Sequence, residues 1–128
     1  PDTPVISISG DGGMQMNIQE LATAVLEELP IISCIFNNNN LGMVRQWQEL
    51  FFNERYSFTP LVNPDFSLIA AANGIECARV EKREELDAAI ERMFSHDDAF
   101  IMEVKVDSGA NVFPMVPAGA AVTDIMLE

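Results

Sequence analysis

A carboxylate and an amide follow two apolar stretches near the start of the chain. Asp11 stands in a Gly-Asp-Gly-Gly run after residues 5–9, and Asn38 stands in a run of asparagines after residues 31–36. Carboxylate, amide and main-chain carbonyl oxygens are ligands that suit Mg²⁺ when it also holds a diphosphate. The residue types therefore predict an oxygen-only cation site made by Asp11, Asn38 and nearby main-chain carbonyls.

The glycines around Asp11 would let a ligand approach the main chain closely. Gly10, Gly12 and Gly13 have no Cβ, and they end a short β-branched run, which is typical of a buried parallel strand opening into a tight turn. The helix predicted after this turn would aim free N–H groups at it, and such groups suit a phosphate. Asp11 would place a second negative charge beside the phosphates, which is expected if a divalent cation lies between its carboxylate and the phosphates.

Alternating strand and helix patterns predict how these residues are positioned. The expected strands are residues 5–9, 31–36, 75–80 and 100–106, and the expected helices are residues 17–28, 43–52, 65–73 and 84–94. This order is typical of an α/β fold with a doubly wound parallel sheet. Ligands of such sheets bind at the carboxyl ends of the strands, where Asp11 and Asn38 both fall. Either Asn63 or Asp65 is expected to cap the third helix.

The periodic pattern ends near residue 107. Residues 108–121 contain glycine, two prolines and few charges, which predicts a surface arm, and residues 124–128 predict a weak helical turn. We therefore expect an α/β domain over residues 1–107 and a C-terminal arm over residues 108–128.

At these residues the sequence resembles the thiamine diphosphate enzymes, whose diphosphate- and Mg²⁺-binding motif is a Gly-Asp-Gly run followed by such an asparagine. The run from Gly10 to Gln48 and the tail V-F-P-M-V-P-A-G-A-A resemble the catalytic subunit of acetohydroxyacid synthase, also called acetolactate synthase. The resemblance implies an α/β thiamine diphosphate-binding fold with the metal on Asp11, Asn38 and Asn40. It implies that the cofactor contacts Gly10, Asp11, Gly12, Gly13, Asn38, Asn40, Leu41, Gly42 and Met43.

The helix after the asparagines has an apolar face that includes Val44 and Trp47. This face could pack against the sheet, or the helix could cap the cofactor pocket. In the resembled family the matching tryptophan lines the substrate pocket and favours the larger second 2-ketoacid, so we assign Val44 and Trp47 to that pocket. Related decarboxylases have a glutamate near position 44 that helps protonate the intermediate. Valine at this position favours carbon–carbon bond formation over aldehyde release.

The resemblance implies thiamine diphosphate and Mg²⁺ as cofactors. The implied reaction is decarboxylation of pyruvate and condensation with a second 2-ketoacid, in branched-chain amino acid biosynthesis. The catalytic glutamate of the family belongs to a pyrimidine-binding domain outside these 128 residues, so no catalytic residue is assigned here. We expect a C-terminal part of a larger homo-oligomeric enzyme, shortened before the first strand and inactive alone. FAD and a regulatory subunit, where used, would contact other domains.

A subunit of a split enzyme is the alternative. Such a chain would bind the cofactor for a thiamine diphosphate-dependent 2-ketoacid decarboxylase or oxidoreductase and would need a partner chain. A neighbouring gene for a pyrimidine-binding chain would favour this alternative, and a single long reading frame would favour the synthase.

The charge and hydropathy of the chain limit the classes of partner that it can have. The formal net charge of −13 argues against nucleic acid and anionic membranes. No apolar run approaches the length that spans a bilayer, and nothing at the start resembles a signal peptide. We expect a cytoplasmic protein, and the resemblance implies small 2-ketoacids as its ligands.

Overall fold

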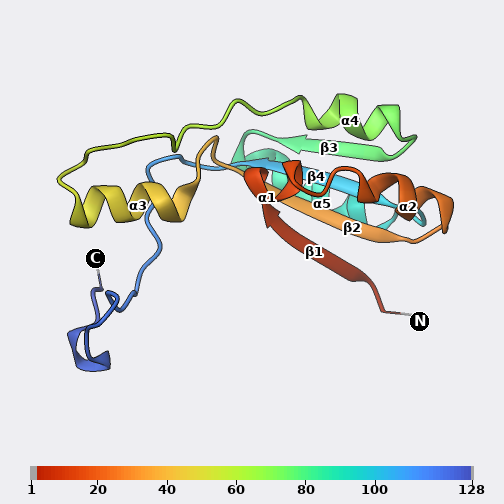
Figure 1. The fold of residues 1–128 in the computed structure, drawn as a ribbon. Helices are drawn as coiled ribbons and strands as arrows, with labels where there is room; N and C mark the ends of the chain where they lie inside the picture. Colours follow the sequence, from red (N-terminus) through yellow and green to blue (C-terminus); the bar gives the residue numbers. More distant parts are fainter. Residues whose placement is uncertain (1–2, 128) are drawn as a thin grey trace.

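The computed structural model describes residues 3–127, and its centre is a four-stranded parallel sheet (Figure 1). The strands are β1 (Val5–Gly10), β2 (Ile31–Asn37), β3 (Glu76–Val80) and β4 (Phe100–Lys105). Their order across the sheet is β1-β2-β4-β3, with every neighbouring pair parallel. The two central strands are rich in apolar residues because both of their faces are covered. The predicted parallel sheet is confirmed, but the first strand, expected to be buried, is wrong in that respect, because β1 lies at the edge of the sheet and is largely exposed.

Helices cover both faces of the sheet. On one face lie α1 (Asp11–Gln15), α2 (Glu20–Leu26) and α4 (Phe66–Ala72), and on the other lies α5 (Leu86–Phe94) after a 3-10 turn at Arg83–Glu85. The first core contains Met14, Leu21, Phe66 and Ala70 against Ile35 and Ile101, and the second contains Ala89 and Met93 against Phe100 and Met102. The doubly wound arrangement is therefore confirmed. None of the described helices has the length and apolar character needed to cross a bilayer.

The single helix predicted over residues 17–28 is wrong in its bounds. The chain is already helical at Asp11, and a turn over residues 16–19 separates α1 from α2. In this turn the side-chain amide of Asn17 donates to the carbonyl of Gly13 at 2.9 Å, a local bond that competes with continued helix. At the other end, Glu28 adopts a left-handed φ of 50°, which ends the helix before Pro30.

Helix α3 (Gly42–Phe51) extends beyond the carboxyl ends of the strands, away from both faces of the sheet (Figure 1). Its one fully buried side chain is polar, that of Gln46, while Met43 and Val44 are about half exposed. The apolar face of α3 is thus not ordinary packing against the sheet. It borders the space beyond the strand ends.

The C-terminal arm follows β4 and runs next to α3 (Figure 1). It contains a 3-10 turn at Val122–Asp124, and Met115 and Met126 pair through two main-chain hydrogen bonds of 3.0 and 2.8 Å. The helical turn expected over residues 124–128 is therefore wrong, because the chain is already extended at Met126; Glu128 lies outside the described residues.

Candidate functional site

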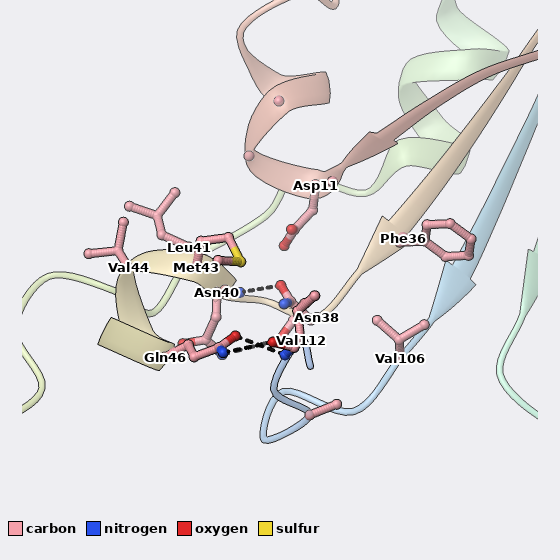
Figure 2. Close-up of a pocket in the computed structure, with 15 residues that line it drawn as sticks. Asp11, Phe36, Asn38, Asn40, Leu41, Met43, Val44, Gln46, Val106 and Val112 are labelled. Atoms are coloured by element: carbon pink, nitrogen blue, oxygen red, sulfur yellow. Dashed lines mark hydrogen bonds between the residues drawn. The ribbon is translucent and has the colours of Figure 1, made fainter. Parts of the chain in front are cut away.

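The carboxyl ends of β1 and β2 lie side by side and open into a pocket of about 430 Å³ (Figure 2). Gly10 pairs with Phe36 across the two strands, so Asp11 and Asn38 follow at neighbouring positions. The pocket is lined by Gly10, Asp11, Gly12, Gly13, Asn38, Asn40, Leu41, Gly42, Met43 and Val44, all singled out from the sequence. The structure adds Phe36 and Gln46, and it adds Val106, Ala110 and Val112 from the chain after β4.

Asp11 is a buried carboxylate that faces this pocket. Its residue is 2% exposed, and its Oδ2 accepts a hydrogen bond of 2.6 Å from Asn63 Nδ2. It forms no ion pair within residues 3–127. Because an ionised carboxylate is costly to bury without a compensating charge, this arrangement suits a cation in the pocket.

The asparagine loop is held in shape by its own polar groups. Asn38 Oδ1 accepts from the main-chain N–H of Asn40 at 3.0 Å, and Asn40 Nδ2 donates to the carbonyl of Asn38 at 3.1 Å. Asn39 between them has a φ of 54°, a left-handed conformation that asparagine tolerates better than most residues. An amide oxygen has two lone pairs, so Asn38 Oδ1 retains one that could bind a cation.

At two glycines near the pocket, an added Cβ would lie too close to a neighbouring side chain. A Cβ on Gly42 would lie 2.8 Å from Asn38 Nδ2, and a Cβ on Gly12 would lie 3.1 Å from Leu61. The tight turn predicted at Gly12 is wrong, because residues 11–15 form α1. Gly12 and Gly42 therefore allow Leu61 and Asn38 to pack closely around the pocket.

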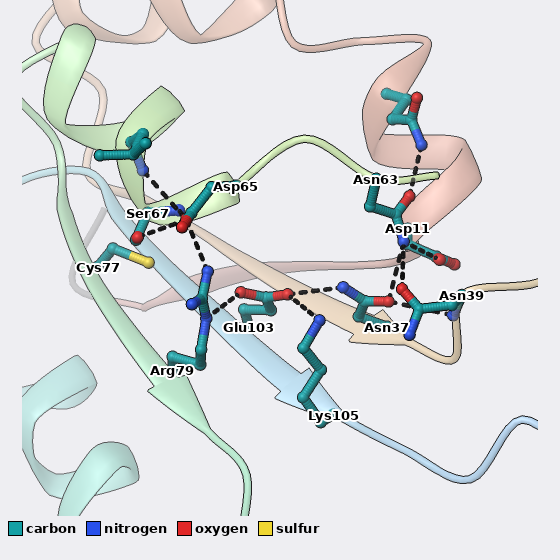
Figure 3. A network of polar contacts seen from close by, with 12 residues as sticks. Asp11, Asn37, Asn39, Asn63, Asp65, Ser67, Cys77, Arg79, Glu103 and Lys105 are labelled. Atoms are coloured by element: carbon teal, nitrogen blue, oxygen red, sulfur yellow. Dashed lines mark hydrogen bonds and ion pairs between the residues drawn. The ribbon is translucent and has the colours of Figure 1, made fainter. Parts of the chain in front are cut away.

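A buried polar network lies behind the pocket and was missed by the sequence analysis (Figure 3). Asn37 and Glu103 are each 1% exposed, and Asn37 Nδ2 donates to Glu103 Oε1 at 2.6 Å. Glu103 also pairs with Lys105 at 2.9 Å and with Arg79 at 2.7 Å. Burial alone would raise the pKa of Glu103, but these three donors hold it below its usual value. The network keeps a charged group at the centre of the sheet next to the asparagine loop.

Asp65, rather than Asn63, caps α4. Asp65 Oδ1 accepts from the main-chain N–H groups of Ser67 and Leu68, and it pairs with Arg79 at 2.6 Å. Asn63 instead reaches across to Asp11. Both residues stand beside a proline at a helix start, where either can act as a cap, so local sequence could not separate their roles.

The C-terminal arm closes one side of the pocket through Gln46 (Figure 2). Gln46 donates to the carbonyl of Val112 at 3.0 Å and accepts from its N–H at 2.8 Å. Asn111 adds a bond of 2.8 Å to Glu49. These residues are more than 60 positions apart, and no local pattern predicts such a contact.

Trp47 lies outside this pocket. It lines a second hollow, of about 410 Å³, with Val44, Gln48, Phe52 and Arg55. Val44 borders both spaces. The assignment of Trp47 to a substrate pocket therefore stays a prediction. A substrate that contacts Trp47 would have to enter the second hollow, which Val44 separates from the first pocket.

A family model described as "Thiamine pyrophosphate enzyme, C-terminal TPP binding domain" matches residues 1–104. The chain belongs to this family of thiamine pyrophosphate-binding domains. The acetolactate synthase isozyme 2 large subunit of Escherichia coli (strain K12) is 42% identical over 127 residues, covering 98% of this chain and 23% of that protein. The mitochondrial acetolactate synthase catalytic subunit of Saccharomyces cerevisiae is 41% identical over 126 residues, covering 98% of this chain and 18% of that protein.

Solved structures share the fold of this thiamine pyrophosphate-binding domain. The thiamine diphosphate-dependent 4-hydroxybenzoylformate decarboxylase of Rhodococcus jostii RHA1 superposes with a TM-score of 0.77 at 24% identity, covering 84% of this chain and 20% of that one. The chain thus spans about a fifth of the length of the relatives and of the solved chain that it matches.

Proposed function

We propose that this chain holds the diphosphate of thiamine diphosphate through Mg²⁺, as part of an acetolactate synthase. The observation that carries the proposal is the buried carboxylate of Asp11, which faces a pocket and has no cationic partner among residues 3–127. A divalent cation would supply the missing charge. Its other ligands would be Asn38 Oδ1, the carbonyl of Asn40, the diphosphate and water.

The remaining pocket residues would orient the cofactor and exclude water. Thiamine diphosphate, when bound, supplies the nucleophile and electron sink for 2-ketoacid decarboxylation and carbon–carbon bond formation. Gly10 and Gly13, beside which a Cβ would meet nothing closer than 3.9 Å, would allow the diphosphate to approach the main chain. Apolar side chains from β2, α3 and the arm would surround the rest of the cofactor: Phe36, Leu41, Met43, Val106 and Val112.

The substrate class rests on the relatives and on α3. Both relatives are named acetolactate synthase, so the proposed substrates are pyruvate and a second 2-ketoacid, with Val44 and Trp47 on the substrate side. The words "large subunit" and "catalytic subunit" in these names support a further, regulatory subunit. FAD, a homo-oligomer and a cytoplasmic location stay predictions, and the yeast relative is named mitochondrial.

Product analysis tests the proposal. The assembled enzyme that contains this chain, supplied with thiamine diphosphate, Mg²⁺ and pyruvate, should form acetolactate as its main product. The 128-residue chain alone should form none, because the family's catalytic glutamate is expected in another domain. Acetaldehyde as the main product of the assembled enzyme would contradict the synthase, and acetolactate from the isolated chain would contradict the division of the site between domains.

A further inference from the structure

The side-chain amide of Asn63 faces three oxygens next to the pocket (Figure 3). Asn63 Nδ2 lies 2.6 Å from Asp11 Oδ2, 3.0 Å from Asn37 Oδ1 and 3.0 Å from Asn39 Oδ1. An amide nitrogen has two hydrogens for these three acceptors, so one hydrogen is shared. The bond to the carboxylate is the shortest and is charge-assisted, which makes it the strongest of the three.

The orientation of this amide follows from its partners. Gln15 Nε2 donates to Asn63 Oδ1 on the opposite side, and an ionised carboxylate can only accept. Asn63 therefore presents its nitrogen to Asp11. Asp11 Oδ1 forms no hydrogen bond with another described residue, so this oxygen is free to bind a ligand in the pocket.

The loop that carries Asn63 is fixed on both sides. Before Asn63, it pairs with the asparagine loop through main-chain bonds of 2.8 Å from Leu41 to Thr59 and from Leu61 to Asn39. After it, Asp65 caps α4 and pairs with Arg79. The loop therefore holds Asn63 next to Asp11 and has little freedom to move.

We propose that Asn63 is a positioning residue, which holds Oδ2 of Asp11 so that Oδ1 is presented to the metal ion. The inference rests on the proposed function, because it concerns the same cation. A hydrogen bond to the second oxygen of a ligating carboxylate fixes its rotamer before the metal arrives, and loss of such an outer-shell partner typically weakens metal affinity about 10–100-fold.

The test measures the Mg²⁺ concentration that gives half-maximal thiamine diphosphate binding to the assembled enzyme. Asn63→Ala and the similarly sized Asn63→Leu should raise it about 10–100-fold. Turnover should return at saturating Mg²⁺, because Asn63 does not line the pocket. Gln15→Ala, which frees the amide without removing it, should give a smaller shift in the same direction.

Asn73→Ala is the matched control. Asn73 is also a half-buried asparagine, and its amide caps the end of α4 by donating to the carbonyl of Ile69 at 2.9 Å. It does not line the pocket and does not contact Asp11. It should lower the melting temperature without moving the Mg²⁺ midpoint. Asn63 variants with the midpoint of the parent would overturn the inference, and if both fail to fold, an unshifted Gln15→Ala overturns it. If Asp11→Ala also binds like the parent, the proposed metal site itself is wrong.

Discussion

Gln46 of α3 and Val112 of the arm form a pair of hydrogen bonds. The buried side-chain amide of Gln46 bonds to both the main-chain N–H and the carbonyl of Val112, as a neighbouring strand would. This pair holds residues 106–112 against the pocket that Asp11 and Asn38 border. Two further bonds join the arm to α3: Gln46 Nε2 donates to Met115 Sδ at 3.1 Å, and Asn111 Nδ2 donates to Glu49 at 2.8 Å.

Gln46→Ala should loosen the arm. It removes both bonds to Val112 and the bond to Met115, and it leaves the N–H and carbonyl of Val112 without these partners. This loss should lower the free energy of unfolding by about 1–3 kcal/mol. Hydrogen exchange in the assembled enzyme should become faster at residues 111–116. Gln48→Ala is the control, because Gln48 makes the same pair of bonds with Ser57 instead of the arm. Equal exchange at the arm in both variants would contradict the role of Gln46.

Gly42→Ala should weaken metal binding without weakening the fold. A Cβ at this position would lie 2.8 Å from Asn38 Nδ2 and must displace that side chain. The atom that this Cβ would meet is the end of a side chain, which can move, so the melting temperature should fall little. We expect at least a tenfold higher Mg²⁺ requirement for thiamine diphosphate binding. Gly109→Ala, whose Cβ would make an ordinary contact of 3.5 Å with Asp107, should leave this requirement unchanged.

Acid should destabilise the fold through Asp65. The Ser67 hydroxyl first, and then main-chain N–H groups and Arg79, lower the pKa of Asp65 to about 2 despite some desolvation. Its unfolded pKa is about 4, so its stabilisation is complete above pH of about 4 and is lost as the pH falls towards 2. Glu103, whose pKa is also lowered, adds to the same loss.

Urea unfolding at a series of pH values measures this loss. Asp65→Asn keeps a good capping residue but removes the charge, so its stability should fall less between pH 4 and 2 than that of the parent. Asp87→Asn is the control, because Asp87 is 89% exposed and lies 3.8 Å from Arg83. A parent-like fall in Asp65→Asn would show that other groups cause the acid sensitivity.

Trp47→Leu should change the choice of the second 2-ketoacid. Pyruvate and 2-ketobutyrate differ by one methylene, which an apolar wall can discriminate by about 10- to 200-fold. In the assembled enzyme the variant should lose most of its preference for 2-ketobutyrate and still form acetolactate. A competition assay measures the product ratio, and an unchanged ratio would place Trp47 in ordinary packing with Phe51, whose ring centre is 5.2 Å away.

The sequence predicted the parts of the fold that follow from local patterns. Apolar runs located the four strands within a residue or so at each end, and the parallel topology then required Asp11 and Asn38 to meet at one edge. The helix predicted over residues 17–28 is shorter in the structure, Glu20–Leu26. Asn17 bonds back to Gly13 in the turn before it, and Glu28 takes a left-handed conformation after it.

The long-range polar contacts could not be predicted. Asn63 reaches Asp11 across 52 positions, and Gln46 reaches Val112 across 66. Each depends on where a loop lies after folding, and a single asparagine or glutamine carries no periodic signal. In Asn63-Pro64-Asp65 the local pattern supported a helix cap at either end, and only the folded structure assigns the cap to Asp65.

The most direct test of the proposed metal site is a thiamine diphosphate titration of the assembled enzyme with and without Mg²⁺, comparing the parent with Asp11→Ala. The parent should bind thiamine diphosphate only with Mg²⁺, and Asp11→Ala should lose more than about 100-fold in Mg²⁺-dependent affinity, beyond the loss typical of an outer-shell partner. Asp97→Ala, which removes an exposed carboxylate elsewhere, should bind as the parent does. An Asp11→Ala enzyme with the affinity and Mg²⁺ dependence of the parent would show that this carboxylate does not hold the metal ion.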